Sequence, residues 1–437
     1  MAQFRIDSHQ YLQQEKTLFE VVMLADQYGN QVGPANPTGT AVDAFGRARM
    51  STPLTLFDSS HRYKDNGLWA TSNSSGTTHT FNANAGLIEL NLGTTANQEI
   101  IRETTKVFSY QPGKSLQTLN TVVMEPPKAN LRQRVGYFGA NNGIYLEANG
   151  TSIAFVERSS SNGSMVETRV EQADWNTDTL LGAVVGSPSQ RTLDMSKAQI
   201  VFHDIEWLGL GTVRCGFVID GQLIHCHSFH HANYITSTYM TTASLPLRYE
   251  IKNTGTTASN STMKQVCSSV ISEGGYELRG DQRSVGTPVQ TPKALATAGT
   301  YYPIVSIQLK AGRLDAIAIL TAISLLGINS NPCSAAWRVY RGATLTSPSW
   351  TLGSDDSSVE YDTAATGLSG GQVLAQGYIG ITNQSSQTID ILKEALFKFQ
   401  LQRNSFTGTP EPITIAMSGS VNSISALASL DWEEISR

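Results

Sequence analysis

The stretch that decides the fold is GTVRCGFVIDGQLIHCHSF, residues 211–229. Two apolar runs flank Asp220-Gly221, a dipeptide that favours a two-residue hairpin turn because both turn positions require positive φ. Alternation along a strand separates the flanking side chains into two faces. We expect the core face to hold Cys215, Phe217, Ile219, Ile224 and Cys226. The opposite, more mixed face holds Arg214, Val218, Leu223, His225 and His227.

The same turn predicts the register of the hairpin. Counting outward pairs Cys215 with Cys226, His225 with Gly216 and His227 with Arg214. A hydrogen-bonded pair has Cα atoms about 5.5 Å apart, which is within the range of a disulfide.

The first residues, MAQFRIDSHQ, lack the layout of a signal peptide. We therefore expect assembly in a cytoplasm and four reduced cysteines.

Outside this hairpin, short apolar or alternating runs end in turn dipeptides throughout the chain. Examples are Asn142-Gly143, Asn149-Gly150, Asn162-Gly163 and Gly370-Gly371. Such punctuation is typical of sandwiches and barrels. We predict an all-β, multidomain protein of antiparallel sandwiches with a central concanavalin/laminin-G-like jelly roll, although another antiparallel sandwich would give a similar pattern. Helix is expected only near Leu12–Val22 and Leu392–Leu401.

Composition shifts divide the chain into four parts. Residues 1–110 are expected to form an N-terminal arm and β docking region, and residues 111–280 the jelly roll. Residues 281–299 are polar, contain Pro288 and Pro292, and resemble a linker. Residues 300–437 are expected to form a C-terminal β-sandwich. Apolar residues in the arm are candidates for docking onto a neighbouring protein: Leu18, Phe19, Val21, Val22 and Leu24.

Charge and hydropathy exclude two classes of partner. Charged residues make up 15% of the chain and the formal net charge is −5. Without a basic run there is no electrostatic footprint for nucleic acid. No apolar stretch reaches the roughly 20 residues of a membrane-spanning helix. The nearest, residues 314–326, is expected to lie in a core.

One strand resembles a catalytic motif. Laminarinase-type glycanases carry Glu-x-Asp-x-Glu on one strand, and retaining chemistry needs both outer carboxylates. Here Asp204 and Glu206 occupy the second and third positions, but Phe202 replaces the nucleophile. We therefore expect a protein that is not an enzyme and has no catalytic residues.

The histidines and tryptophans are candidates for binding sites, on weaker signals than a complete motif would give. His225 and His227 would share a strand face and are the candidate metal ligands, but Arg214 beside them disfavours a cation. We expect no metal and no cofactor. Trp175, Trp207 and Trp350 are candidate glycan contacts, although such side chains more often fill cores and subunit interfaces.

Several strings, in the order in which they stand in this chain, resemble those of structural, fibre-like and tail-associated proteins of tailed bacteriophages, particularly of marine and cyanobacterial hosts. They are DAFGRARMSTPLTLFD (43–58), YQPGKS (110–115), RVGYFGANNGIYLE (134–147), DIEWLG (204–209), GFVIDG (216–221), LPLRYEI (245–251) and SEGGYE (272–277). The resemblance covers about residues 40–280. It implies a virion component, bound to other virion proteins and assembled in the host cytoplasm.

Three functions follow from this resemblance and from the residues. The first is a non-enzymatic tail or baseplate fibre-like protein, with a homotrimer favoured. The second is a capsid-attached decoration, cement or head-fibre protein. A module that recognises host-surface glycans is the alternative from another class, and a glycan depolymerase is the least favoured.

Overall fold

A computed structural model describes residues 52–277, 279–381 and 399–436, together with strands β1 (Gln10–Gln14), β2 (Thr17–Val21) and β28 (Gln387–Asp390). The chain divides into two compact units, residues 1–52 and 53–437. In the first unit, β1 and β2 pair antiparallel. The helix expected near Leu12–Val22 is therefore wrong. Of the proposed docking residues, Leu18, Phe19 and Val21 belong to β2, whereas Val22 and Leu24 lie outside the described residues.

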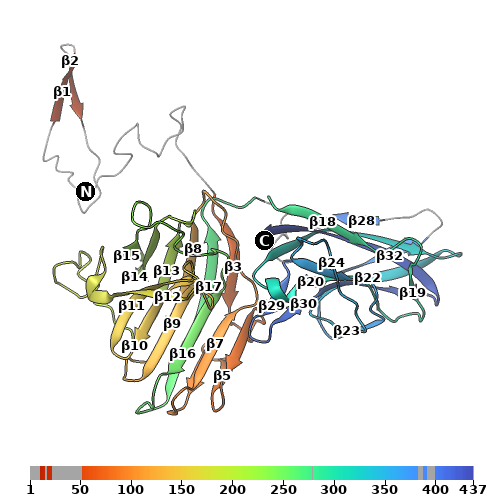
Figure 1. Ribbon diagram of the computed structural model, residues 1–437, viewed down its shortest axis with the longest axis horizontal. Coiled ribbons are helices and arrows are strands. Elements are labelled where there is room, and N and C mark those ends of the chain that lie inside the picture. Colours follow the sequence, from red (N-terminus) through yellow and green to blue (C-terminus); the bar gives the residue numbers. More distant parts are fainter. Residues whose placement is uncertain are drawn as a thin grey trace. The chain divides into compact units, whose positions relative to one another are not determined.

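The second unit begins with a β-sandwich of two antiparallel sheets (Figure 1). One sheet has seven strands in the order β12-β11-β10-β9-β16-β7-β4. The other has eight, in the order β15-β14-β13-β8-β17-β6-β5, with β3 also paired to β17. The strands are β3 (Leu54–Ser60), β4 (Trp69–Asn73), β5 (Thr78–Asn82), β6 (Leu87–Leu92), β7 (Glu99–Thr104), β8 (Leu116–Val123), β9 (Leu131–Phe138), β10 (Gly143–Asn149), β11 (Ser152–Ser159), β12 (Val166–Glu171), β13 (Ala198–Ile205), β14 (Val213–Ile219), β15 (Gln222–Phe229), β16 (Leu247–Asn253) and β17 (Ser261–Ser272).

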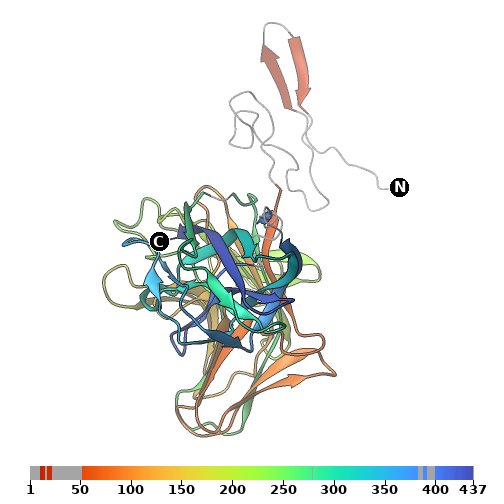
Figure 2. The same cartoon turned by 90° about the vertical axis from the view of Figure 1, so that its right-hand side faces the viewer.

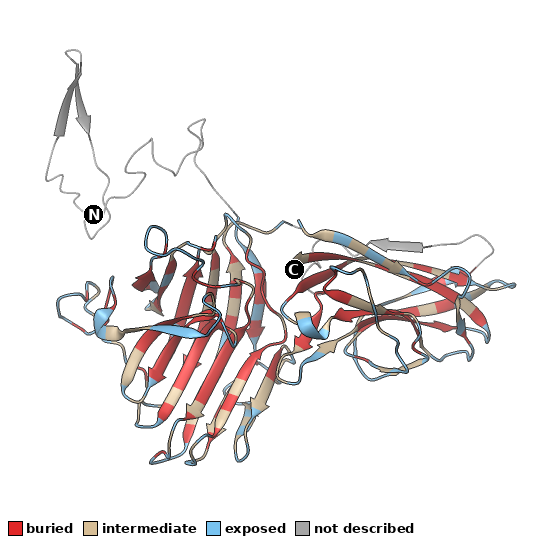
Figure 3. Ribbon diagram, viewed as in Figure 1, coloured by how far each residue is buried: buried red, intermediate tan, exposed pale blue. Residues whose placement is uncertain are grey.

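One apolar core fills the space between these two sheets. Alternate residues of facing strands, such as Leu90, Val122, Val135 and Ile251, are almost completely buried there. Figure 3 shows that burial continues along the central strands of the sandwich. The predicted all-β sandwich is confirmed, because period-two alternation gives each sheet one apolar face that it must bury.

The expected boundary at residue 110 is wrong. Residues 54–104 contribute β4 and β7 to one sheet and β3, β5 and β6 to the other. Of these strands, β7 pairs with β16, and β3 and β6 pair with β17, more than a hundred residues further along the chain. Such long-range pairing leaves no local signature in the sequence, so the start of the sandwich was placed about fifty residues too late.

A second β-sandwich follows, and it faces the viewer in Figure 2. Its sheets have the orders β18-β32-β21-β28, with β19 beside β32, and β24-β25-β20-β31-β22-β27. Two small sheets, β23-β26 and β29-β30, complete it. The strands are β18 (Asp281–Gly286), β19 (Lys293–Leu295), β20 (Tyr302–Leu309), β21 (Ile317–Ile328), β22 (Cys333–Arg341), β23 (Thr344–Thr346), β24 (Thr351–Leu352), β25 (Val359–Asp362), β26 (Gly367–Ser369), β27 (Gln372–Ile381), β29 (Gln402–Asn404), β30 (Thr409–Glu411), β31 (Ile413–Gly419) and β32 (Ile424–Ser436).

The segment expected to be a linker belongs to this second sandwich. Within residues 281–299, β18 and β19 both pair antiparallel with β32. Because their partner β32 lies more than a hundred residues further along the chain, the local sequence gives no sign of this pairing, and its polar composition suggests a linker instead. In contrast, residues 314–326 do lie largely in the core, because most of β21 is buried. The described residues contain no helix long and apolar enough to cross a membrane.

The two sandwiches meet through buried polar contacts. Arg403 donates from Nη1 to the carbonyl of Thr104 at 2.6 Å and forms an ion pair with Glu103 at 3.2 Å. Gln400 donates to the carbonyl of Val107 at 2.9 Å. Val107 also packs against Ile317 and Ile319. The chain segment after β7 is thus held by the second sandwich at several points.

The central hairpin has the predicted turn but not the whole predicted register. Asp220 and Gly221 have φ of 51° and 74°, as a type I′ turn requires. His225 faces Gly216 as expected, but a β-bulge then places His227 opposite Cys215. Cys226 is the extra residue, so the predicted Cys215–Cys226 pair and the His227–Arg214 pair are both wrong. All four cysteines are free thiols, with Cys215 and Cys226 completely buried.

Candidate functional site

The glycanase-like strand is β13. Phe202 is buried, and its ring lies so close to Gly216 that a Cβ there would come within 2.6 Å of Phe202 Cε1. Asp204 is buried and forms an ion pair with Arg214 on β14. Burial raises the pKa of Asp204, although Arg214 opposes the shift. Glu206 follows the strand and is exposed. An apolar ring thus occupies the place of the nucleophilic carboxylate, and Arg214 engages the next carboxylate.

Two neighbouring pockets open at this end of the eight-stranded sheet. The smaller, about 480 Å³, is polar and includes Asp204, Glu206, Thr212 and Arg214. The larger, about 720 Å³, includes Tyr110, Trp207, Thr242 and Ser244, and also Ile435 of the second sandwich. Gly113 and Lys114 line both pockets. The two pockets therefore adjoin across the segment between β7 and β8.

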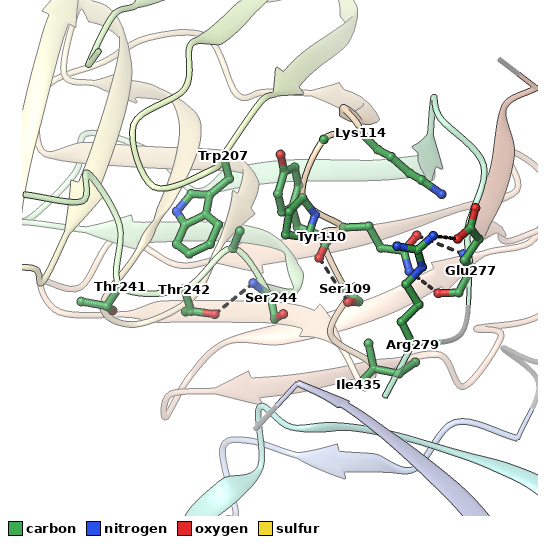
Figure 4. A pocket seen from close by; sticks show the side chains of 14 residues that line it. Ser109, Tyr110, Lys114, Trp207, Thr241, Thr242, Ser244, Glu277, Arg279 and Ile435 are labelled. Atoms are coloured by element: carbon green, nitrogen blue, oxygen red, sulfur yellow. Dashed lines mark hydrogen bonds and ion pairs between the residues drawn. The ribbon is translucent and has the colours of Figure 1, made fainter. Parts of the chain in front are cut away.

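Figure 4 shows how side chains surround the larger pocket. The rings of Tyr110 and Trp207 meet edge to face, with centroids 6.0 Å apart. Ser244 donates its backbone N–H to Thr242 Oγ1 at 3.0 Å, which fixes the opposite wall. Trp207 Nε1 is buried without a hydrogen-bond partner among the described residues. The pocket thus combines an aromatic wall with hydroxyl groups.

The candidate histidines do not converge on a metal. His225 Nε2 lies 2.9 Å from Ser228 Oγ, whereas His227 Nδ1 accepts the backbone N–H of Asn176 at 3.3 Å. Burial, and then His225 and His230, lower the pKa of His227 to about 4. Burial lowers the pKa of His203 to about 3. In the described part of the chain, no three His, Cys, Asp or Glu side chains form a group that could hold a metal ion.

His231, which belongs to the same histidine-rich stretch of sequence, has a different environment. His231 Nδ1 lies 2.5 Å from the carbonyl oxygen of Gly211, and Nε2 lies 2.6 Å from Glu157 Oε2. Both partners are acceptors, so the ring donates from both nitrogens when it is protonated. Burial lowers the pKa of His231, but Glu157 and the Gly211 carbonyl outweigh burial and raise it. The ring also stacks on Tyr239, at 3.9 Å between centroids.

The structure places the three candidate tryptophans in different environments. Trp175 is buried in the core, tilted against Phe155 at 4.6 Å, and donates Nε1 to the carbonyl of Val170. It is therefore not a glycan contact. Trp350 is half-buried in the second sandwich, between β23 and β24. Trp207 lines the larger pocket.

Sequence reasoning also missed an ionic face on the seven-stranded sheet, opposite its core face. We define it by Arg134, Glu147, Arg158, Glu167 and Glu250. Arg134 lies 2.6 Å from Glu147, 3.2 Å from Glu167 and 3.4 Å from Glu250. Arg158 lies 2.7 Å from Glu167, whose pKa is lowered because Tyr145 and the two guanidiniums outweigh burial. Arg134 and Glu147 face each other across β9 and β10, but a two-residue turn at Asn142-Gly143 would pair Arg134 with Thr151, so no local signal in the sequence predicted this contact.

Comparisons with known proteins give a likeness of fold alone. No family model and no curated protein matches the chain. Among solved structures, the Emp47p carbohydrate recognition domain is 10% identical, with 48% of this chain and 90% of that chain covered, at a TM-score of 0.31. The Bacillus licheniformis β-glucanase is 13% identical, with 49% and 96% covered, at a TM-score of 0.31. A conserved carbohydrate esterase from Shiga toxin-encoding bacteriophage phi24B is 11% identical, with 51% and 100% covered, at a TM-score of 0.30. At these values the matches carry no argument about function.

Proposed function

We propose that the chain is a non-enzymatic structural component of a tailed-phage particle, associated with the tail or baseplate. The phage assignment depends on the ordered sequence strings between residues 40 and 280. The structural role is carried by one observation, the junction of the two sandwiches at Glu103, Arg403 and Val107. Several buried contacts at one junction favour a body of fixed geometry, which suits repeated protein–protein contacts in a particle.

The absence of catalysis is supported by β13. Retaining glycosidases need two carboxylates about 5–5.5 Å apart. Phe202 occupies the first position, and Arg214 engages Asp204. We expect no release of reducing ends from β-glucans. Steady hydrolysis that Glu206→Gln abolishes would contradict this part of the proposal.

Labelling of intact particles tests the location. Gold-conjugated antibody against the 53–437 unit should decorate the tail or baseplate in negative-stain images. Label on the head would instead support the decoration or head-fibre alternative. Particles without label would reject a virion role altogether.

The proposed arm and oligomer have separate tests. Residues 1–33 should be dispensable for folding of the body and required for incorporation into particles, because apolar arms gain order on a partner. Normal incorporation of the truncated chain would contradict docking through the arm. Light scattering of the purified full chain should give the mass of a trimer.

Recognition of a host-surface glycan is the second candidate function. It is favoured by the larger pocket, in which Tyr110 and Trp207 form an aromatic wall beside hydroxyl groups. This role is compatible with a structural one, because a protein on the surface of a particle can both hold its neighbours and bind a host glycan.

A further inference from the structure

The two adjoining pockets offer one surface with two chemical characters. Trp207 lines the larger pocket, and its sequence neighbour Glu206 lines the smaller one. Lys114 borders both pockets. A ligand that extends across Lys114 would therefore meet an aromatic wall on one side and charged hydrogen-bonding groups on the other.

The aromatic side of this surface is suited to a ligand with apolar faces and polar edges. Trp207 packs partly against the core and edge to face with Tyr110, so its ring is held in one orientation. Its buried Nε1 has no acceptor among the described residues. This nitrogen has almost no accessible surface, so a ligand in the pocket would meet the ring of Trp207 and not this donor.

The charges around the two pockets balance. Lys114, Arg214 and Arg279 oppose Asp204, Glu206 and Glu277. Arg214 pairs with Asp204, and Arg279 pairs with Glu277. Lys114 and Glu206 have no ion-pair partner in the described part of the chain. Lys114 thus remains as a donor and Glu206 as an acceptor. The charged residues that line the two pockets have no net charge that would attract a phosphate or another polyanion.

We propose that these adjoining pockets bind an oligosaccharide of neutral sugars, with Trp207 against an apolar sugar face and with Lys114 and Glu206 on hydroxyl groups. This inference rests on the second candidate function and names its ligand class and its residues. The hydroxyl groups of a sugar serve as both donors and acceptors, so they can accept from Lys114 and donate to Glu206. The pyranose ring offers C–H faces to an aromatic wall.

The test is a titration of the purified full chain with neutral hexasaccharides, namely cellohexaose, laminarihexaose, maltohexaose and mannohexaose, followed by calorimetry. Hexagalacturonate serves as the charged comparison. At least one neutral hexasaccharide should bind at micromolar to millimolar concentration. Trp207→Ala should weaken that binding roughly tenfold or more, as truncation of a central aromatic contact does. Trp207→Phe should retain part of it, and Glu206→Gln should have a smaller effect than Trp207→Ala.

Tyr234→Ala is the matched control, because Tyr234 is 77% exposed and lies outside both pockets. It should bind like the wild type. Urea unfolding of each variant separates lost binding from lost folding. The inference is overturned if no neutral hexasaccharide binds, if only hexagalacturonate binds, or if folded Trp207→Ala binds like the wild type. These results leave the virion role intact, whereas unlabelled particles reject that role and leave the pocket intact.

Discussion

The ionic face of the seven-stranded sheet and the pocket end of the eight-stranded sheet both carry charged side chains, but they use them differently. On the ionic face, Arg134 and Arg158 are buried and meet carboxylates on neighbouring strands. At the pocket end, Lys114 and Glu206 border open space instead. Charges that are buried and paired fix the shape of a sheet, because either partner alone would be left uncompensated. Charges that border a pocket remain available to a ligand.

The largest effect is expected from breaking the ionic face. Arg134→Met removes the partner shared by Glu147, Glu167 and Glu250 and leaves buried carboxylates less compensated. We expect the free energy of unfolding to fall by about 3–5 kcal/mol, measured by urea denaturation. Glu206→Gln, at the pocket end, should change it by less than about 0.5 kcal/mol. Equal effects of the two substitutions would remove the distinction between the regions.

A smaller effect is expected at the turn between β14 and β15, at the opposite end of β14 from the pocket residue Arg214. Gly221→Val should cost about 1–2 kcal/mol, because a β-branched side chain is forced into the left-handed region. No atom lies within 4 Å of the added Cβ, so the cost is conformational and not steric crowding by neighbours. Gln222→Thr, one residue further in the extended strand β15, should cost little. A neutral Gly221→Val in urea denaturation would contradict the role of the turn.

Two buried histidines have pKa values shifted in opposite directions, so they should contribute differently to the pH dependence of stability. The pKa of His231 is raised, so its contribution is fully present below the unfolded value of about 6.5 and is lost as pH rises through the folded pKa. His231→Gln should therefore destabilise most at pH 5 to 6 and progressively less toward pH 9. The pKa of His227 is lowered to about 4, so stability from this group is lost as pH falls from about 6.5 toward 4.

Thermal unfolding of the two variants across this pH range measures both trends. His227→Asn should flatten the acid side of the profile, and His231→Gln should lower stability at pH 5 to 6 and so flatten the decline on the neutral to alkaline side. If both substitutions gave the same pH dependence, Glu157 would not hold a proton on His231.

The smallest effect on stability is expected from thiol labelling. Modification of an exposed cysteine should leave stability unchanged as long as the reagent does not reach the core. Burial raises the pKa of Cys215, Cys226 and Cys267, but Cys215 and Cys226 are completely buried whereas Cys267 is exposed to the reagent. In the native protein, Ellman's reagent should label Cys267 first and spare Cys215 and Cys226. The denatured, unreduced protein should show four thiols. A count of two would indicate a bridge and contradict the expected cytoplasmic assembly.

Local chemistry made several features predictable. Asp220-Gly221 produced its turn because the dipeptide tolerates positive φ wherever it stands. Alternation predicted the burial of Cys215 and Phe217. The Arg134–Glu147 pair was not predictable in this way, because Gly143 lies within β10 and not in the turn, and Glu167 and Glu250 come from strands that no local pattern connects.

The sequence by itself determined the strand-rich class, the turn at Asp220-Gly221 and the presence of an apolar residue, Phe202, two positions before Asp204, because each depends on a few local residues or on a period of two. Only the tertiary structure decided which residues meet. It moved Cys226 out of register through a bulge, buried Trp175 while Trp207 lines a pocket, and joined residues 54–104 to strands near the end of the first sandwich. These outcomes depend on long-range pairing and on packing between sheets, and neither is encoded in any short window of the chain.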